Sequence, residues 1–268
     1  MPDLRGRYQR ARTRVEASAA GRLQRRMVEL ELMNQALILS ALALMLFIPA
    51  LISLAAVLPL GDSTGMASGL AHRVGLSPTA TRYLQALLPD EQTVQATTGG
   101  GALLSLLFAY SWPATLMRGY ETIWELPSRG RRDAWRPLVW LVVFFSVVVA
   151  ASAFDQLGSG AIAEIGTALL GLPVAVAWAW WSQHLLLAGR VTWRALLPGA
   201  VSLALALTGL RVFLHFYLSR NIESQYRSYG PIGVVFVLQS WLIAFSVVML
   251  GAPLLGRFIA VARGSDSP

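Results

Sequence analysis

The sequence predicts an all-α, polytopic membrane protein with six transmembrane helices, an amphipathic amino-terminal helix, and short extracytoplasmic helices between the first two spans. Of its 268 residues, 55% are hydrophobic and only 13% are charged, a balance that favours burial in lipid over a soluble fold. An α-helix rises about 1.5 Å per residue, so about 20 apolar residues cross a hydrocarbon layer of about 30 Å. Six apolar stretches are long enough to cross most or all of that layer, and we take them as the spans: about 35–58, 99–118, 137–157, 163–187, 196–217 and 231–260.

The distribution of arginine predicts the orientation in the membrane. All 22 basic residues are Arg, and 17 of them lie on one side: before the first span, from the end of span two to the start of span three, between spans four and five, or from residue 257 to the end of the chain. Four lie in the connections on the opposite side, and Arg211 falls inside the fifth span. Because basic residues are enriched in cytoplasmic connections, both termini are expected in the cytoplasm. An even number of spans agrees with this orientation.

Residues 1–33 have apolar positions at three- and four-residue spacing with arginine between them, which predicts the amphipathic helix. One interpretation is a helix that lies on the anionic inner leaflet of the membrane. The other is a helix packed beneath the bundle, whose arginines are solvated or paired, as Arg25 and Glu29 could be. Residues 261–268 are expected to form a short cytoplasmic tail.

The segment 59–98 is the largest predicted extracytoplasmic connection, and we expect it to be helical. Ser77 and Pro78 are a typical N-cap and first-turn pair, which predicts a helix whose Ala80 and Tyr83 share one face. With a shorter helix before it, this helix is expected to cover the outer mouth of the bundle.

The second span is expected to be the least regular of the six helices. It opens with Gly99-Gly100-Gly101 and contains Pro113, and both features disturb a helix. Irregular backbone at membrane depth is tolerated where it lines a cavity or is covered by protein. Pro113 is therefore either part of a binding cavity or an ordinary kink packed against neighbouring helices.

Polar residues at membrane depth are the candidates for a binding site. Arg211 lies toward the outer end of the fifth span, and His215 follows one turn later. A charge inside the membrane is costly, so it normally faces a partner or water. Asp155, at the outer end of span three, and Glu164, at the outer start of span four, are expected at the same depth. The four residues predict an ion pair that ties these spans together, a site for an anionic group such as a lipid phosphate, or a proton relay through Arg211 and His215.

Two further polar groups lie within the predicted spans. Gln239 sits in the middle of the last span, where we expect it to hydrogen-bond to a neighbouring helix, and we keep it among the binding candidates. A tryptophan-rich group near the cytoplasmic end of span four is typical of an interfacial aromatic belt. Its members are Trp178, Trp180, Trp181, Ser182, Gln183 and His184.

Several classes of function find no support in the sequence. The net charge of +8 follows the membrane orientation and does not indicate a nucleic-acid-binding module, so no nucleic-acid partner is expected. The chain has no Cys, and its three His residues lack metal-ligand spacing. It has no phosphate-binding glycine loop and no Ser nucleophile in a G-x-S-x-G setting. We therefore expect no cofactor, no metal and no catalytic residue, and we do not expect an enzyme.

Several stretches, taken in order, resemble the YihY/BrkB family of inner-membrane proteins, in the form found in actinobacteria. The first span contains Phe47-Ile-Pro-Ala-Leu-Ile-Ser53, and the second ends in Arg118-Gly-Tyr-Glu121, followed by a basic run. The last span is the closest match, with Tyr229-Gly-Pro-Ile-Gly-Val-Val-Phe-Val-Leu-Gln-Ser-Trp241 and then Leu250-Gly-Ala252. The resemblance covers most of residues 30–260.

The resemblance implies a multi-pass protein of the bacterial cytoplasmic membrane that is linked to the cell envelope. Ties of relatives to serum resistance and to export of envelope lipid or lipopolysaccharide imply the handling of amphiphiles. An earlier label of the family as a ribonuclease finds no support here, because no cluster of carboxylates lies in an aqueous loop. The family often carries an acidic residue where this chain has Pro253, so no role of that carboxylate carries over.

Two functions follow as hypotheses. The first is binding or export of an anionic, lipid-like envelope component, driven by an ion gradient or a partner because the chain has no ATPase motif. Its partners would be membrane lipids and that amphiphile. The second is a non-transporting scaffold for envelope proteins, which would use the arginine-rich amino-terminal helix and the loop 129–136 as contacts and could form homo-oligomers.

Overall fold

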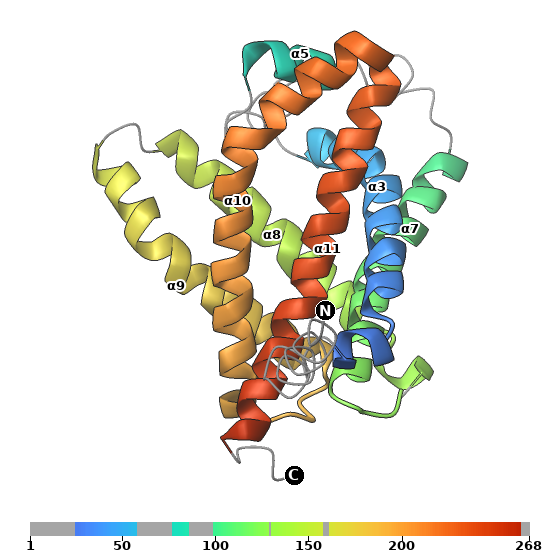
Figure 1. Ribbon diagram of the computed structural model, residues 1–268, viewed down its shortest axis with the longest axis vertical. Helices are drawn as coiled ribbons and strands as arrows, with labels where there is room; N and C mark the ends of the chain where they lie inside the picture. The colour runs from blue at the N-terminus through green and yellow to red at the C-terminus, as the bar shows by residue number, and fades with distance from the viewer. Residues whose placement is uncertain (1–24, 58–76, 86–98, 129, 158–160, 264–268) are drawn as a thin grey trace, which may run out of the picture.

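In the computed structural model, the described residues form helices and no strand (Figure 1). The structure describes residues 25–57, 77–85, 99–128, 130–157 and 161–263. Within these ranges it leaves out the side chains of 47–57, 84–85, 99–106, 148–157 and 161–170, and those of the single residues 108, 131, 215, 216 and 219. The all-α fold class is confirmed for this part of the chain.

Six long helices coincide with the six apolar stretches, and consecutive helices run in alternating directions (Figure 1). Their bounds are α3 Leu32–Val57, α7 Gly99–Ile123, α8 Arg136–Leu157, α9 Ala161–Leu186, α10 Trp193–Tyr229 and α11 Pro231–Ala262. Within the described residues, two segments are long and apolar enough to cross a membrane by length and composition, Trp193–Leu214 and Pro231–Ala262.

The two ends of the bundle are built from different segments. Residues 25–31, the α7–α8 and α9–α10 connections and the end of α11 lie at the lower end in Figure 1, which we call the basic end. Four arginines that bind acidic residues or backbone carbonyls lie there: Arg26, Arg136, Arg190 and Arg257. At the opposite end, which we call the α5 end, helix α5 (Pro78–Gln85) packs on α10. The first and last described residues therefore lie at the same end of the bundle.

Helices α10 and α11 form a hairpin whose backbones touch near both ends. At the basic end, a Cβ added to Gly256 would overlap the backbone of Gly199, and one added to Gly199 would come 3.0 Å from Gln183 Oε1 of α9. At the α5 end, a Cβ added to Gly233 would overlap the backbone carbonyl of Gln225. Small residues at these points let the helix axes approach closely, which is a common packing device between membrane helices.

The helix predicted at Ser77 is present and docks on an extension of α10. Ala80 N donates to Ser77 Oγ at 3.1 Å, which is the expected N-cap bond. Ser77 Oγ donates to Glu223 Oε1, and the Tyr83 ring stacks on Tyr226 with centroids 3.8 Å apart. Because α5 covers this part of α10, the helix continues well past the predicted end of the fifth span.

The second span is more regular than expected. Helix α7 runs continuously over Gly99–Ile123, and Pro113 is buried inside it. The glycine run forms the first turn, where backbone N–H groups have no intrahelical partner in any case. The burial of Pro113 favours the packed kink over the cavity-lining alternative.

A turn separates the amino-terminal segment from the first long helix. Residues 25–29 are helical, and Glu31 has a left-handed φ of 49°, so α3 begins at Leu32. Met27 and Leu30 pack against the core, which favours the packed interpretation for this part of the predicted amphipathic helix. Residues 1–24 of that helix lie outside the described residues, as do 59–76 and 86–98 of the extracytoplasmic connection and 264–268 of the tail.

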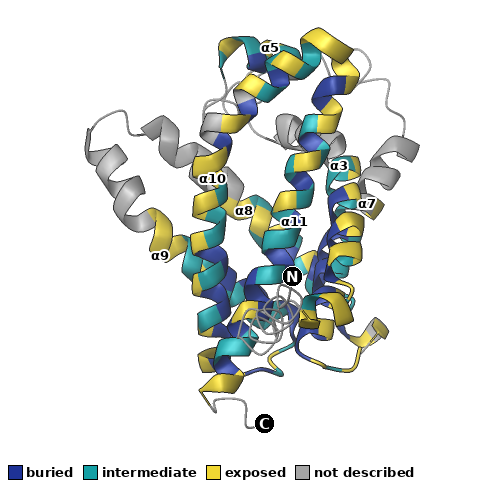
Figure 2. Cartoon of the chain, viewed as in Figure 1, coloured by how far each residue is buried: buried dark blue, intermediate teal, exposed yellow. Residues whose placement is uncertain are grey.

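Buried side chains gather toward the basic end, along α10, α11 and α3 (Figure 2). Trp140 of α8 lies in this core, with its ring centroid 5.4 Å from that of Trp112 on α7 and 5.7 Å from that of Trp178 on α9. Trp140 Nε1 donates to Ser182 Oγ at 2.5 Å, and both groups are buried. Trp140 therefore joins the tryptophan-rich group of α9 to α8, and through Trp112 to α7.

Gly256→Ala tests the crossing of α10 and α11. The added methyl group would overlap the Gly199 backbone, so we expect the free energy of unfolding to fall by about 1–3 kcal/mol. Thermal unfolding of the detergent-solubilised protein measures the change. Gly251→Ala on the same helix is the control, because nothing lies within 4 Å of its added Cβ, and alanine is the better helix former. Equal stability of the two variants would contradict this crossing.

Candidate functional site

The candidate residues at membrane depth lie on three helices. Arg211 is exposed on α10 and His215 follows on the same helix, while Asp155 is on α8 and Glu164 on α9. The side chains of His215, Asp155 and Glu164 lie outside the described residues. The ion pair, the anion site and the proton relay therefore all stay predictions.

Gln239 has the interhelical partner that its position led us to expect. Its Nε2 donates to Ser40 Oγ of α3 at 3.0 Å, and Ser40 Oγ donates to Leu37 O at 2.8 Å. The bond links α11 to α3, which gives the amide a structural role in the described part of the chain. Pro113, the remaining candidate, is buried within α7.

At the basic end, the structure brings together arginines that sequence analysis had used only to orient the chain. Arg190 Nη2 pairs with Glu121 Oε1, and the two side chains are only 10% and 3% exposed. Arg190 Nη1 donates to Pro127 O at 2.6 Å, and its Nε donates to Leu187 O at 3.0 Å. One buried guanidinium therefore joins the segment after α9 to the end of α7.

Arg136, the first residue of α8, forms a second link of this kind. Its Nε donates to Asp133 Oδ1 at 3.1 Å and its Nη1 donates to Leu185 O near the end of α9 at 2.9 Å. The last carbonyls of a helix lack intrahelical partners and carry partial negative charge. Arginine supplies both the hydrogen-bond donors and the positive charge, so Arg136 and Arg190 stabilise the C-terminal end of α9. Arg190 also holds the segment after α7 through Pro127 O.

The backbone at the end of α7 takes a specific hydrogen-bonded form. Leu126 N donates to Glu121 O at 2.9 Å, and Glu125 N donates to Thr122 O at 3.2 Å, which is the pattern of a Schellman C-cap. Glycine usually occupies the left-handed position of this motif, but here Glu125 does so with φ 53°. The left-handed backbone places a carboxylate at a position where this motif usually has glycine and therefore no side chain.

Glu125 lies between two arginines that are far apart in the sequence. Arg26 Nη2 is 3.1 Å from its Oε1, and Arg257 Nη2 is 3.0 Å from its Oε2. Arg257 Nη1 also donates to Ile123 O. The hydrogen bond from Arg257, followed by the two positive charges, holds the pKa of Glu125 below its ordinary value. Glu125 thus links the segment 25–29, the end of α7 and the last turns of α11.

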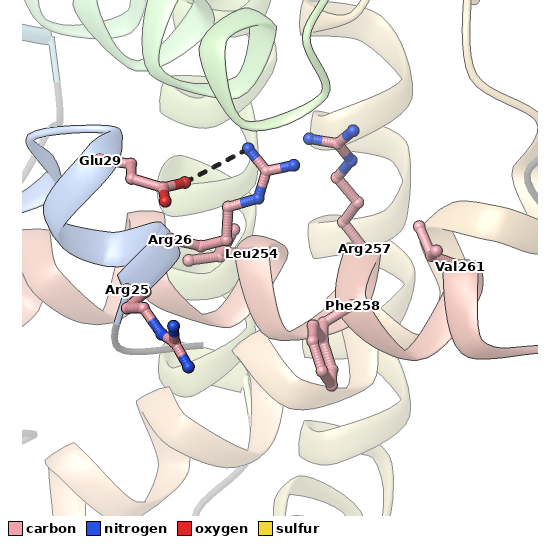
Figure 3. A pocket seen from close by; sticks show the side chains of 7 residues that line it. All are labelled: Arg25, Arg26, Glu29, Leu254, Arg257, Phe258 and Val261. Carbon is pink, nitrogen blue, oxygen red and sulfur yellow. Dashed lines mark ion pairs between the residues drawn. The ribbon is translucent and has the colours of Figure 1, made fainter. Parts of the chain in front are cut away.

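The same two arginines line a groove between residues 25–29 and the end of α11 (Figure 3). Its volume is about 400 Å³, and we call it the arginine groove. Figure 3 shows the guanidinium groups of Arg26 and Arg257 on the same side of the groove. The lining combines charged and apolar side chains: Arg25, Arg26, Glu29, Leu254, Arg257, Phe258 and Val261. Cationic groups beside apolar surface have the chemistry that binds an anionic amphiphile.

A second groove of about 460 Å³ lies between α10 and α11 and has a different character. Its lining includes the aromatic residues Phe213, Tyr217, Phe236 and Trp241, and none of its lining residues is charged. It therefore offers no counter-charge to an anionic head group, and the arginine groove is the stronger candidate site. No group of three or more side chains that could hold a metal occurs among the described residues.

Sequence analysis missed the links at the basic end, although a signal was present. Between residues 99 and 154, the acidic residues are Glu121, Glu125 and Asp133. Each of the three binds an arginine in the structure. Carboxylates within a segment rich in positive charge indicate pairing, but they do not reveal which arginine each one meets.

Comparison with known families matches residues 23–263 to the model of a family described as Virulence factor BrkB. The match covers nearly the whole chain, includes every residue of the arginine groove, and confirms the resemblance found in the sequence. Comparisons with curated proteins and with solved structures give no match.

Arg190→Gln tests the buried link between α7 and the α9–α10 connection. Removing one partner of a buried ion pair leaves the other uncompensated, so we expect the free energy of unfolding to fall by about 3–5 kcal/mol. The double variant Arg190→Gln with Glu121→Gln should be less destabilised than the single variant, because no buried charge is left alone. Arg118→Gln, at an exposed position of α7, is the control, with a change below about 0.5 kcal/mol. Identical thermal unfolding of Arg190→Gln and the control would show that the pair does not stabilise the fold.

Proposed function

The chain belongs to the BrkB (YihY) family of inner-membrane proteins, and from this premise we propose that it binds an anionic amphiphile of the cell envelope and moves it across the membrane. The observation that carries the proposal is the arginine groove. There, Arg26 and Arg257 lie beside the apolar side chains of Leu254, Phe258 and Val261.

The groove fits the two chemical parts of such a ligand. Guanidinium groups bind phosphate or carboxylate oxygens through paired, charge-assisted hydrogen bonds. The apolar side chains on α11 offer a surface along which the first part of an acyl chain could pack. Basic clusters next to a membrane attract anionic lipids by about 1 kcal/mol per residue, which raises the local concentration of such a ligand.

We further propose that the six long helices all span the membrane, with the basic end in the cytoplasm. The alternating directions of the helices and the gathering of paired arginines at one end support this topology. In this orientation the arginine groove meets the inner leaflet. Arg211, nearer the other leaflet on α10, is the candidate for a second contact with the head group.

The driving force has to come from outside the chain in this proposal. The sequence contains no nucleotide-binding glycine loop, so an ion gradient or a partner protein would supply the energy for net export. Exchange between the leaflets at equilibrium needs no such energy and can be measured with the protein alone.

Reconstituted vesicles test the proposal directly. Vesicles of phosphatidylcholine with a trace of fluorescent phosphatidylglycerol report movement between leaflets when a membrane-impermeant quencher is added. We expect faster movement than in protein-free vesicles, and slower movement with Arg257→Gln than with the wild type. Arg194→Gln is the matched control, because Arg194 is exposed at the same end and does not line the groove. Movement at the protein-free rate would rule out transport of this lipid and favour the scaffold alternative.

Single cysteines test the topology, since the natural chain has none. Ser128→Cys lies at the basic end, and Ser228→Cys lies on α10 near the α5 end; both serines are exposed. In intact cells, a membrane-impermeant maleimide should label Cys at 228 and should label Cys at 128 only after the cells are opened. The reverse pattern, or labelling of both from outside, would contradict the proposed orientation.

A further inference from the structure

We propose that Glu125 is a built-in counter-ion of the arginine groove, and that the phosphate of an anionic phospholipid displaces it from Arg26 and Arg257 when the lipid binds. The exchange would break the ion-pair link between Arg26 and the end of α7 and so loosen residues 25–30 there. The ligand class rests on the proposed function, whereas the exchange itself rests on the contacts of Glu125.

The two carboxylate oxygens of Glu125 are divided between the two arginines. Oε1 is 3.1 Å from Arg26 Nη2, and Oε2 is 3.0 Å from Arg257 Nη2. A phosphodiester also presents two anionic oxygens, so it can replace the carboxylate between the same guanidinium groups. Leu254, Phe258 and Val261 lie in the same groove and would meet the apolar part of the lipid.

Exposure makes the ion pair of Arg26 and Glu125 exchangeable. Both of these side chains are 49% exposed, whereas Arg257 is 18% exposed and Glu121, in its pair with Arg190, is 3% exposed. A pair that is open to solvent contributes little net free energy, so a competing anion can replace it at small cost. The buried Glu121–Arg190 pair keeps α7 in place while the exchange occurs.

The backbone of Glu125 also points to a role for its carboxylate. Its left-handed conformation, with φ 53°, is one that glycine adopts at lower cost. A glycine would end α7 equally well but would leave Arg26 and Arg257 without this partner. A glutamate is already ionised at neutral pH, and the arginines lower the pKa of Glu125 further, so its carboxylate competes with a lipid phosphate under physiological conditions.

The two arginines differ in what holds them after the exchange. Arg257 also donates to Ile123 O, so its guanidinium stays in position when Glu125 leaves. Arg26 has a second carboxylate partner in Glu29 of its own segment, at 3.6 Å, and that bond does not tie it to α7. Lipid binding is therefore expected to loosen the segment 25–30 relative to α7 and to leave α11 unchanged.

Lipid affinity provides the first test. Native mass spectrometry of the detergent-solubilised full chain, titrated with phosphatidylglycerol or phosphatidylcholine, measures the dissociation constant of each lipid. Glu125→Gln removes the competing charge and should bind phosphatidylglycerol about three- to tenfold more tightly than the wild type. Arg257→Gln should bind it more weakly. Glu223→Gln, the same change of charge near the α5 end, is the control and should match the wild type.

The position of the amino-terminal segment provides the second test, and it needs no change at Glu125. Spin labels at Val28→Cys and Thr122→Cys, both exposed positions, report the distance between the segment and α7. Addition of phosphatidylglycerol should lengthen the mean distance between the labels or broaden its distribution, and addition of phosphatidylcholine should do neither. In the Glu125→Gln variant, the distribution of distances between the labels should be broad before any lipid is added.

The results separate the displacement from the proposed function. Phosphatidylglycerol binding that depends on Arg257 but is equal in Glu125→Gln and the wild type would overturn the displacement and leave the binding site standing. An unchanged spin-label distance on addition of phosphatidylglycerol would also overturn the displacement. Equal binding of both lipids to every variant would overturn the displacement and the proposed amphiphile site together.

Discussion

The capping of helix ends by arginine is the interaction on which the rest of the structure depends. Helix α7 ends near α9, and the last carbonyls of both helices lack intrahelical partners and need hydrogen-bond donors from other segments. Arg257 donates to Ile123 O at the end of α7, and Arg136 donates to Leu185 O near the end of α9. Arg190 donates to Leu187 O and Pro127 O, and the buried carboxylate of Glu121 balances its charge. With α7 ended in this way, Glu125 is placed against Arg26 and Arg257, two of the residues that line the arginine groove.

Arginine therefore has two roles at the basic end. As a class, the arginines predict which side of the membrane the connections occupy, because that tendency depends only on their number. Individually, Arg136, Arg190 and Arg257 bind acidic side chains and backbone carbonyls and join segments that are distant in the sequence. A guanidinium group suits this second role because its donors point in fixed directions and can serve a carboxylate and a carbonyl at once.

The hairpin of α10 and α11 connects this end of the protein to the other. The crossing at Gly199 and Gly256 brings the last turns of α11 against the start of α10, and those turns carry Arg257, Phe258 and Val261 into the groove. At the α5 end, Ser77 and Tyr83 hold the extension of α10. A lipid that loosens residues 25–30 would act on the most exposed of these links and leave the hairpin intact.

The sequence by itself determined the positions of the six long helices, the cap at Ser77, the need of Gln239 for a partner and the membership of the family. Each of these follows from properties that can be read along the chain: the length of the apolar stretches, the residue types at turns and helix caps, and the order of short motifs. The sequence did not show that Arg190 pairs with Glu121, 69 residues away, or that Arg257 donates to the carbonyl of Ile123, 134 residues away. Which charges meet depends on which helices are neighbours and how closely they cross, and hydropathy carries no information about either. Only the tertiary structure therefore decided that Glu125 stands between two arginines at a groove.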